Sequence, residues 1–147
     1  MAITNSNLEE VRIGVRLKIS ALWIGMLFLF AYGDIFGFFR RGVIEDVMAG
    51  KVSGIEITQT FLFAVSVYIA IASAMVFLSL VLRPTVARAS NLVLAAVYVV
   101  SIVASAIGET SGYYLFLSAG EIALLLLVIG YAWTWPRAER AASDAER

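Results

Sequence analysis

Residues 57–82 read ITQTFLFAVSVYIAIASAMVFLSLVL, a run of 26 residues without one charged side chain. Three other apolar runs, at residues 20–40, 89–108 and 113–135, are also close to the roughly 20 residues that cross a bilayer. Because lipid offers no hydrogen bonds to the backbone, such runs form helices. The sequence therefore predicts an all-α fold, in which residues 1–147 form one integral membrane domain, a four-helix up-down bundle.

The overall composition supports this class of protein and excludes others. Apolar residues make up 61% of the chain and charged residues 15%, whereas soluble domains average about 45–50% and 25%. The net charge is zero, so no nucleic-acid partner is expected. The chain has no Cys and no His, which excludes disulfides, thiolate metal sites and imidazole catalysis. We expect no metal and no cofactor.

The two ends of the chain are polar. Residues 6–19 are predicted to form an amphipathic segment on the membrane surface, starting at a capping box made by Ser6 and Glu9. The first apolar run begins beyond this polar segment, so we expect a mature N-terminus and no signal peptide. The last residues, 136–147, form a charged, polar C-terminal tail.

The outer loop, residues 41–56, is the largest predicted connection between spans. Its apolar spacing indicates a short helix that ends at Gly50. Ser53 and Glu56 fit a second capping box, which is expected to start the second span. The loop either caps the bundle or is an ordinary interfacial linker, and the second interpretation is preferred.

Lys and Arg residues are distributed unevenly between the two sides of the predicted bundle. The N-terminal segment, the second loop and the tail together carry eight, and the first and third loops carry three. Short cytoplasmic loops are enriched in these residues. Both termini are therefore expected in the cytoplasm.

Two carboxylates interrupt the apolar runs, Asp34 in the first and Glu121 in the fourth. Ionisable residues inside a membrane are costly and are functional candidates. Counted along antiparallel helices, both lie at similar depth in the outer half, so they are expected to face each other or share a cavity. Arg40 or Arg41 is near enough to reach back toward Asp34, but hardly to Glu121. The bundle is thus expected to be apolar toward the cytoplasm and polar in its outer core.

Burial and the proximity of a like charge both favour the neutral form of a carboxyl. This predicts a site for a proton, a cation or a cationic substrate. The equal alternative is a protonated or hydrated carboxyl that only donates an interhelical hydrogen bond. Hydroxyl groups at helical spacing complete the candidate site: Tyr114, Ser118, Tyr98 and Ser101. Such hydroxyls more often join neighbouring helices than bind a ligand.

Small residues four positions apart predict close helix packing, either within one bundle or between protomers. The first span holds such a pair, Gly33 and Gly37, on either side of Asp34. A second pair, Ala119 and Ala123, surrounds Glu121. These four residues are the predicted helix-packing positions.

Three stretches resemble a family of small bacterial four-span membrane proteins with no assigned function. They are ALWIGMLFLFAYGDIFGFF (21–39), IEDVMAGKVSG (44–54) and EIALLLLVIGYAWTW (121–135). The resemblance covers nearly the whole chain and implies a four-helix fold in a bacterial inner membrane. It implies no catalytic residues.

Three functions are compatible with a membrane bundle of this kind. The first is a small transporter or channel that uses Asp34 and Glu121. The second is a scaffold or accessory subunit that binds lipid, a second copy or another membrane protein through its small-residue faces. The third is an enzyme that acts on a lipid. It has the least support, because the sequence offers no nucleophile or metal cluster.

Overall fold

The computed structural model describes residues 12–136 and confirms the all-α class. Its elements in chain order are α1 (Val15–Gly37), α2 (Val43–Met48), β1 (Lys51–Val52), β2 (Ile55–Glu56), α3 (Gln59–Val81), α4 (Pro84–Ala106) and α5 (Gly112–Trp133). Four of these helices, α1, α3, α4 and α5, are long and apolar enough to cross a membrane. The chain is thus a multi-pass membrane protein.

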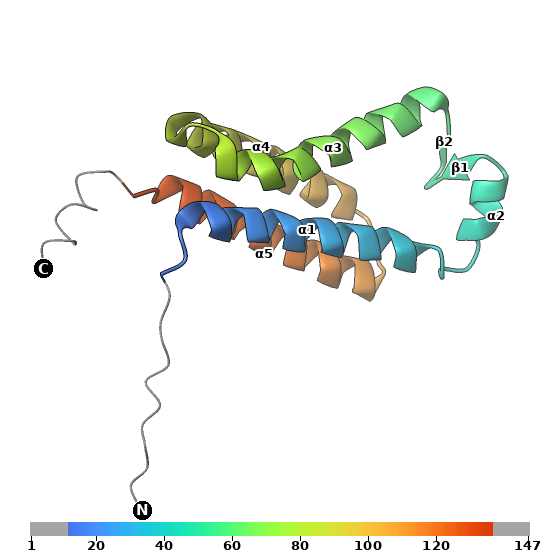
Figure 1. Ribbon diagram of the computed structural model, residues 1–147. Coiled ribbons are helices and arrows are strands. Elements are labelled where there is room, and N and C mark those ends of the chain that lie inside the picture. The colour runs from blue at the N-terminus through green and yellow to red at the C-terminus, as the bar shows by residue number, and fades with distance from the viewer. Residues whose placement is uncertain (1–11, 137–147) are drawn as a thin grey trace, which may run out of the picture.

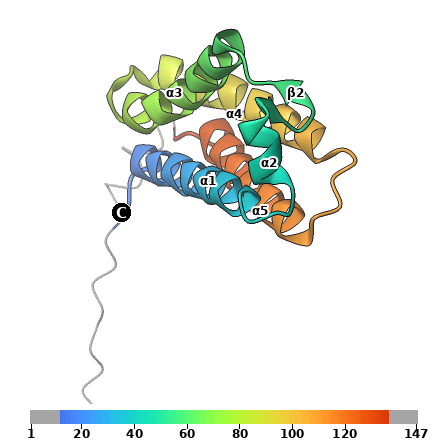
Figure 2. The same cartoon turned by 90° about the vertical axis from the view of Figure 1, so that its right-hand side faces the viewer.

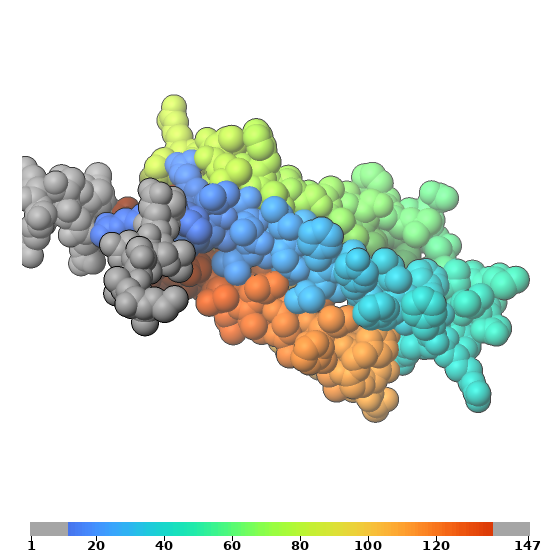
Figure 3. Space-filling model, turned by 60° about the horizontal axis from the view of Figure 1, so that its bottom comes forward, coloured from blue at the N-terminus to red at the C-terminus, as the bar shows by residue number. Residues whose placement is uncertain are grey.

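The four long helices run up and down, so the start of α1 and the end of α5 lie at the same end of the bundle (Figure 1). We call this the terminal end, and the opposite end, which carries α2, the loop end. Helix α1 packs between α3 and α5, and α4 packs mainly on α5. Figure 3 shows α1 lying between α3 and α5 along the face that it presents.

Helix α3 is joined to the bundle through only part of its length. Its buried side chains are Ala72, Met75 and Ser79, all toward the terminal end, and its first half buries none. Figure 1 shows α3 slanting away from the other helices toward its first residues. The bundle is therefore closely packed near the terminal end and more open near the loop end.

The outward surfaces of the long helices are apolar. Phe63, Phe77 and Phe116 are between 63% and 76% exposed in the isolated chain. Exposed apolar surface of this extent is typical of a protein that contacts lipid. The side chains around the bundle therefore meet the bilayer.

The first long helix starts earlier than the sequence suggested. Residues 15–19, assigned to a separate surface segment, form the first turns of α1, and Ile19 is fully buried. Residues 12–14 of that segment are not helical, and its earlier part, including the Ser6 and Glu9 capping box, lies outside the described residues. Helix α4 likewise begins at Pro84 rather than near residue 89, because proline suits the first turn of a helix.

The loop between α1 and α3 holds α2 and a two-stranded hairpin (Figure 2). Gly50 follows α2 with φ +76°, as expected of a residue that ends a helix. The predicted capping box of Ser53 and Glu56 is wrong. Ser53 and Gly54 both have positive φ, 47° and 79°, and form the turn between β1 and β2. Helix α3 is instead capped by Thr58.

The Thr58 hydroxyl accepts a hydrogen bond from the Phe61 N–H at 3.1 Å. Helix α2 buries no side chain and packs mainly against β1. The observed loop therefore fits an interfacial linker better than a cap over the bundle.

Candidate functional site

A small cavity lies in the half of the bundle nearer the loop end. Its volume is about 50 Å³, and α1, α4 and α5 contribute its walls. The polar residues that line it are Asp34, Ser105, Tyr114, Ser118 and Glu121. The apolar ones are Phe30, Gly33, Ile102 and Leu117. The two membrane carboxylates therefore share one cavity, and no Lys or Arg lines it.

The two carboxylates enter this cavity from different environments. Glu121 lies on the buried face of α5 between Ser118 and Leu125, and is only 5% exposed. Asp34 lies in the last turn of α1 and is exposed along one side. The pair thus combines one carboxyl enclosed by protein with one at the rim of the bundle.

Two of the three hydroxyl groups that line the cavity, those of Tyr114 and Ser105, already donate hydrogen bonds. Tyr114 donates a hydrogen bond to Ser105 Oγ at 3.0 Å, and Ser105 donates to the Ile102 carbonyl at 2.8 Å. Among the described residues, no side-chain hydrogen bond joins either carboxyl to a protein group. Within the described chain, neither carboxyl is therefore tied to another helix by a side-chain hydrogen bond.

Two of the predicted site residues, Tyr98 and Ser101, do not line the cavity. Ser101 Oγ lies 2.6 Å from the Tyr68 hydroxyl, and the Tyr98 hydroxyl donates to the Tyr68 carbonyl. The Tyr68 and Tyr98 rings are 4.4 Å apart between centroids. These side chains therefore join α4 to α3, as the alternative interpretation of the hydroxyl stripes expected.

The family of unknown function DUF6326 matches residues 9–142 of the chain. The chain belongs to this family. It matches no curated protein and no solved structure. The family assignment therefore covers the cavity and all four long helices and leaves the function to be inferred from the geometry.

Arg40 does not approach Asp34 as expected. It pairs instead with Glu109, in the turn between α4 and α5, at 3.0 Å. Hydrogen bonds from Ser111, from Arg40 and from the Thr110 N–H lower the pKa of Glu109 to about 2. This exposed pair joins the end of α1 to the α4–α5 turn and leaves Asp34 without a cationic partner among the described residues.

A second polar cluster was missed by the sequence analysis. It lies in the half nearer the terminal end. The fully buried Asn91 accepts a hydrogen bond from the Trp23 indole N–H at 2.7 Å and donates to the Ala87 carbonyl at 2.8 Å. Ser79 Oγ lies 3.1 Å from the same Asn91 oxygen. The expectation that this half is purely apolar is therefore wrong.

The polar cluster ties α1, α3 and α4 together, because Trp23, Ser79 and Asn91 come from these three helices. Asn91 belongs to the polar stripe on the third span that also includes Tyr98 and Ser101. That stripe was the only feature of the sequence that indicated the cluster. Its Asn91 end lies in the closely packed half and not at the cavity. Tyr98 makes an edge-on contact with Trp23 of this cluster, with 5.6 Å between the ring centroids.

The predicted packing residues fall into two groups. Gly33 and Gly37 lie on the face of α1 that meets α5, where added Cβ atoms would come within 3.7 Å of Leu117 and 3.8 Å of the Tyr113 hydroxyl. Ala119 and Ala123 lie on the exposed face of α5. This pair therefore faces away from the side of α5 that buries Ser118, Glu121 and Leu125.

Proposed function

We propose that this chain binds a proton or a small cation between Asp34 and Glu121 and moves it across a bacterial inner membrane. The observation that supports this proposal is the shared cavity, which holds two carboxylates and no cationic side chain. Membrane carboxylates of this kind mark proton relays and ion pathways. In this proposal Glu121 is the binding carboxyl and Asp34 passes the ion to and from the rim.

The size of the cavity favours a small ion. About 50 Å³ accommodates a few water molecules or one cation with part of its hydration shell. Sites for drug-sized ligands occupy about 300–1,000 Å³. A proton or an inorganic cation therefore fits the site as it stands, and an organic cation does not.

The uneven packing of the bundle supports a site open toward one side. Between the cavity and the terminal end lies the closely packed region of Trp23, Asn91 and Leu125, all 0% exposed. In this proposal the terminal end faces the cytoplasm, and the distribution of Lys and Arg supports that orientation. The cavity then opens away from the cytoplasm, and transport requires α3 or its neighbours to move so that the packed half separates.

A second function is supported by a different surface. Ala119 and Ala123 leave a shallow strip on the exposed face of α5, where another helix can approach closely. A scaffold or accessory subunit would use this strip to bind a second copy or another membrane protein. It predicts copurification with that partner and full tolerance of Glu121→Gln.

Flux in liposomes tests the transport proposal. A vesicle-trapped pH dye and a sodium dye report movement of protons and Na⁺ after a pH jump. We expect Glu121→Gln to abolish the protein-dependent flux and Asp34→Asn to reduce it. Glu45→Gln, on the exposed α2 helix, is the matched control and should retain wild-type flux.

Two results would refute transport. One is a wild-type protein whose vesicles leak no faster than empty ones. The other is undiminished flux in Glu121→Gln when circular dichroism shows the same helix content and size-exclusion chromatography the same monodisperse peak as wild type.

A further inference from the structure

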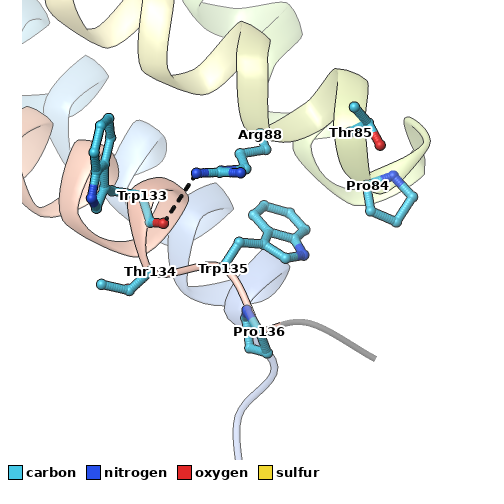
Figure 4. Close-up of a pocket in the computed structure, with 7 residues that line it drawn as sticks. All are labelled: Pro84, Thr85, Arg88, Trp133, Thr134, Trp135 and Pro136. Atoms are coloured by element: carbon cyan, nitrogen blue, oxygen red, sulfur yellow. Dashed lines mark hydrogen bonds between the residues drawn. The ribbon is translucent and has the colours of Figure 1, made fainter. Parts of the chain in front are cut away.

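A second, larger cavity lies at the terminal end, remote from the carboxylates. Its volume is about 480 Å³, and it lies between the first turn of α4 and the end of α5. Figure 4 shows Arg88 reaching from α4 toward the Trp133 carbonyl, with the Trp135 ring nearby and Thr85 across the hollow. A cavity of this size is in the range of small-molecule and headgroup sites.

Arg88 is held in place within this cavity. Its Nε donates to the Ala132 carbonyl at 3.0 Å, and one terminal nitrogen donates to the Trp133 carbonyl at 3.4 Å. These bonds fix the guanidinium at the C-terminal end of α5, where a cation is favourable. A guanidinium has five N–H donors, so Arg88 retains donors for an acceptor in the cavity.

Basic residues are concentrated at the end of the bundle that holds this cavity. Within residues 12–136, the terminal end carries five cations and no carboxylate: Arg12, Arg16, Lys18, Arg83 and Arg88. The acidic residues of the same range all lie in the half nearer the loop end: Asp34, Glu45, Asp46, Glu56, Glu109 and Glu121. The described residues of the terminal end therefore contribute positive charge, which favours an anion in the cavity.

Tryptophan side chains indicate the depth of the cavity in the membrane. Trp133 and Trp135 both line it, and Trp133 is 70% exposed in the isolated chain. Trp rings concentrate at the level of the lipid headgroups. Arg16 lies on the Trp135 ring, 5.8 Å from its centroid, and adds a second guanidinium close to this wall.

We propose that this cavity binds the phosphate of an anionic phospholipid, with Arg88 as the hydrogen-bonding cation and Trp133 and Trp135 beside the glycerol region. Basic pockets at the ends of membrane helices accommodate anionic headgroups in this way. The site is independent of Asp34 and Glu121 and does not depend on the transport proposal. It adds a specific lipid to the contacts of the chain with the bilayer.

Nanodiscs with equal amounts of phosphatidylcholine and phosphatidylglycerol test the proposal. Native mass spectrometry of the released protein measures which lipid stays bound. We expect phosphatidylglycerol to be enriched on the wild type and Arg88→Gln to lower that enrichment by about tenfold, a size typical of hydrogen bonds to a charged group. Arg12→Gln removes the same charge at the same end without touching the cavity and should change the enrichment by less than about twofold.

A second variant tests the site without removing Arg88, in case Arg88→Gln fails to fold. Thr85→Glu leaves the Arg88 hydrogen bonds in place and adds a negative charge to the cavity wall, so it should also abolish the enrichment. Equal effects of Arg12→Gln and Arg88→Gln would overturn the proposal, because they indicate diffuse attraction. So would retained enrichment in Thr85→Glu.

The source of the phosphate is distinguished by a separate measurement. Inorganic phosphate is titrated into protein in pure phosphatidylcholine nanodiscs, and Trp fluorescence is followed. No saturable change at millimolar phosphate supports a lipid ligand. A saturable change that Arg88→Gln removes would overturn it in favour of a free phosphate site.

Discussion

The buried contact between Asn91 and Trp23 makes a strong prediction about stability. Both side chains are 0% exposed, and the indole N–H lies 2.7 Å from the Asn91 carbonyl oxygen. Asn91→Ala removes this acceptor and leaves the Trp23 N–H buried without a partner. An unsatisfied buried donor costs about 1–3 kcal/mol, and interhelical hydrogen bonds in membranes average about 0.6 kcal/mol with a maximum near 1.7.

We therefore expect Asn91→Ala to lower the free energy of unfolding by about 1–3 kcal/mol. The measurement is reversible unfolding by dodecyl sulfate in mixed micelles, followed by far-ultraviolet circular dichroism. A double-mutant cycle isolates the contact. In the Trp23→Phe background, which has no indole N–H, Asn91→Ala should cost about 1 kcal/mol less than in the wild type.

The control cycle combines Trp23→Phe with Ser66→Ala. Ser66 is exposed on α3 and bonds only to the Leu62 carbonyl of its own helix, so the two effects should add within about 0.5 kcal/mol. A Trp23–Asn91 coupling energy no larger than that of the control cycle would refute the reasoning. It would mean that the polar cluster does not hold α1 against α4.

Two further predictions concern the loop end and the α1–α5 contact. The pKa of Glu109 is lowered from 4.5 to about 2, so its contribution to stability is present above pH 4.5 and is lost as the pH falls toward 2. The melting temperature of the wild type should therefore fall more steeply across this range than that of Glu109→Gln, and parallel curves would contradict the assignment. Gly120→Leu should destabilise the protein by about 1–3 kcal/mol, because even a Cβ there lies 3.0 Å from the Leu29 side chain. Gly130→Leu is the control and should leave stability unchanged, because no atom lies within 4 Å of its new Cβ. Equal losses of stability for the two variants in dodecyl sulfate unfolding would argue against a packed contact between Gly120 and Leu29.

The sequence predicted the features that depend on local composition. Long apolar runs must be helical in lipid, so the four long helices follow from a count of residues. The similar depth of Asp34 and Glu121 also follows from counting, because depth along antiparallel helices depends only on helical rise. Neither inference requires knowledge of how each helix is rotated.

Features that depend on helix rotation were not predictable in this way. A polar stripe on α4 comprises Asn91, Tyr98, Ser101 and Ser105. Only Ser105 lines the cavity, and the other three contact α1 and α3. Which neighbour a stripe meets is set by the packing of whole helices. Ala119 similarly lies on the exposed face of α5, so its spacing does not reflect a contact within this bundle, and a contact between protomers stays a prediction.

Competition between local signals explains the error in the loop. Ser53 satisfies the spacing of a helix cap, but Ser53 and Gly54 also suit a tight hairpin turn. The hairpin prevails, and Thr58, five residues later, takes the capping role. Arg40 had a similar choice of partner, and the fold of the α4–α5 turn brings Glu109 to it.

A cysteine experiment distinguishes a cavity that admits ions from a merely buried polar seam. The chain contains no cysteine, so a single introduced thiol reports its own surroundings. Ser118 and Ser79 form a matched pair, because they are 5% and 0% exposed and only Ser118 lines the cavity. Ag⁺ is a small thiol-reactive cation that suits a space of about 50 Å³.

Ag⁺ is added outside proteoliposomes in chloride-free buffer, and unblocked thiols are then counted with a maleimide after denaturation. Ser53→Cys on the hairpin and Thr85→Cys at the start of α4 report which end faces outward. We expect Ser118→Cys to be blocked much faster than Ser79→Cys, and only in molecules whose loop end faces the Ag⁺. Equal rates for the two serines, or blocking of Ser118→Cys from the terminal end alone, would contradict a cavity open toward the loop end. The proposal that Glu121 binds an ion delivered from that side would then lose its physical basis.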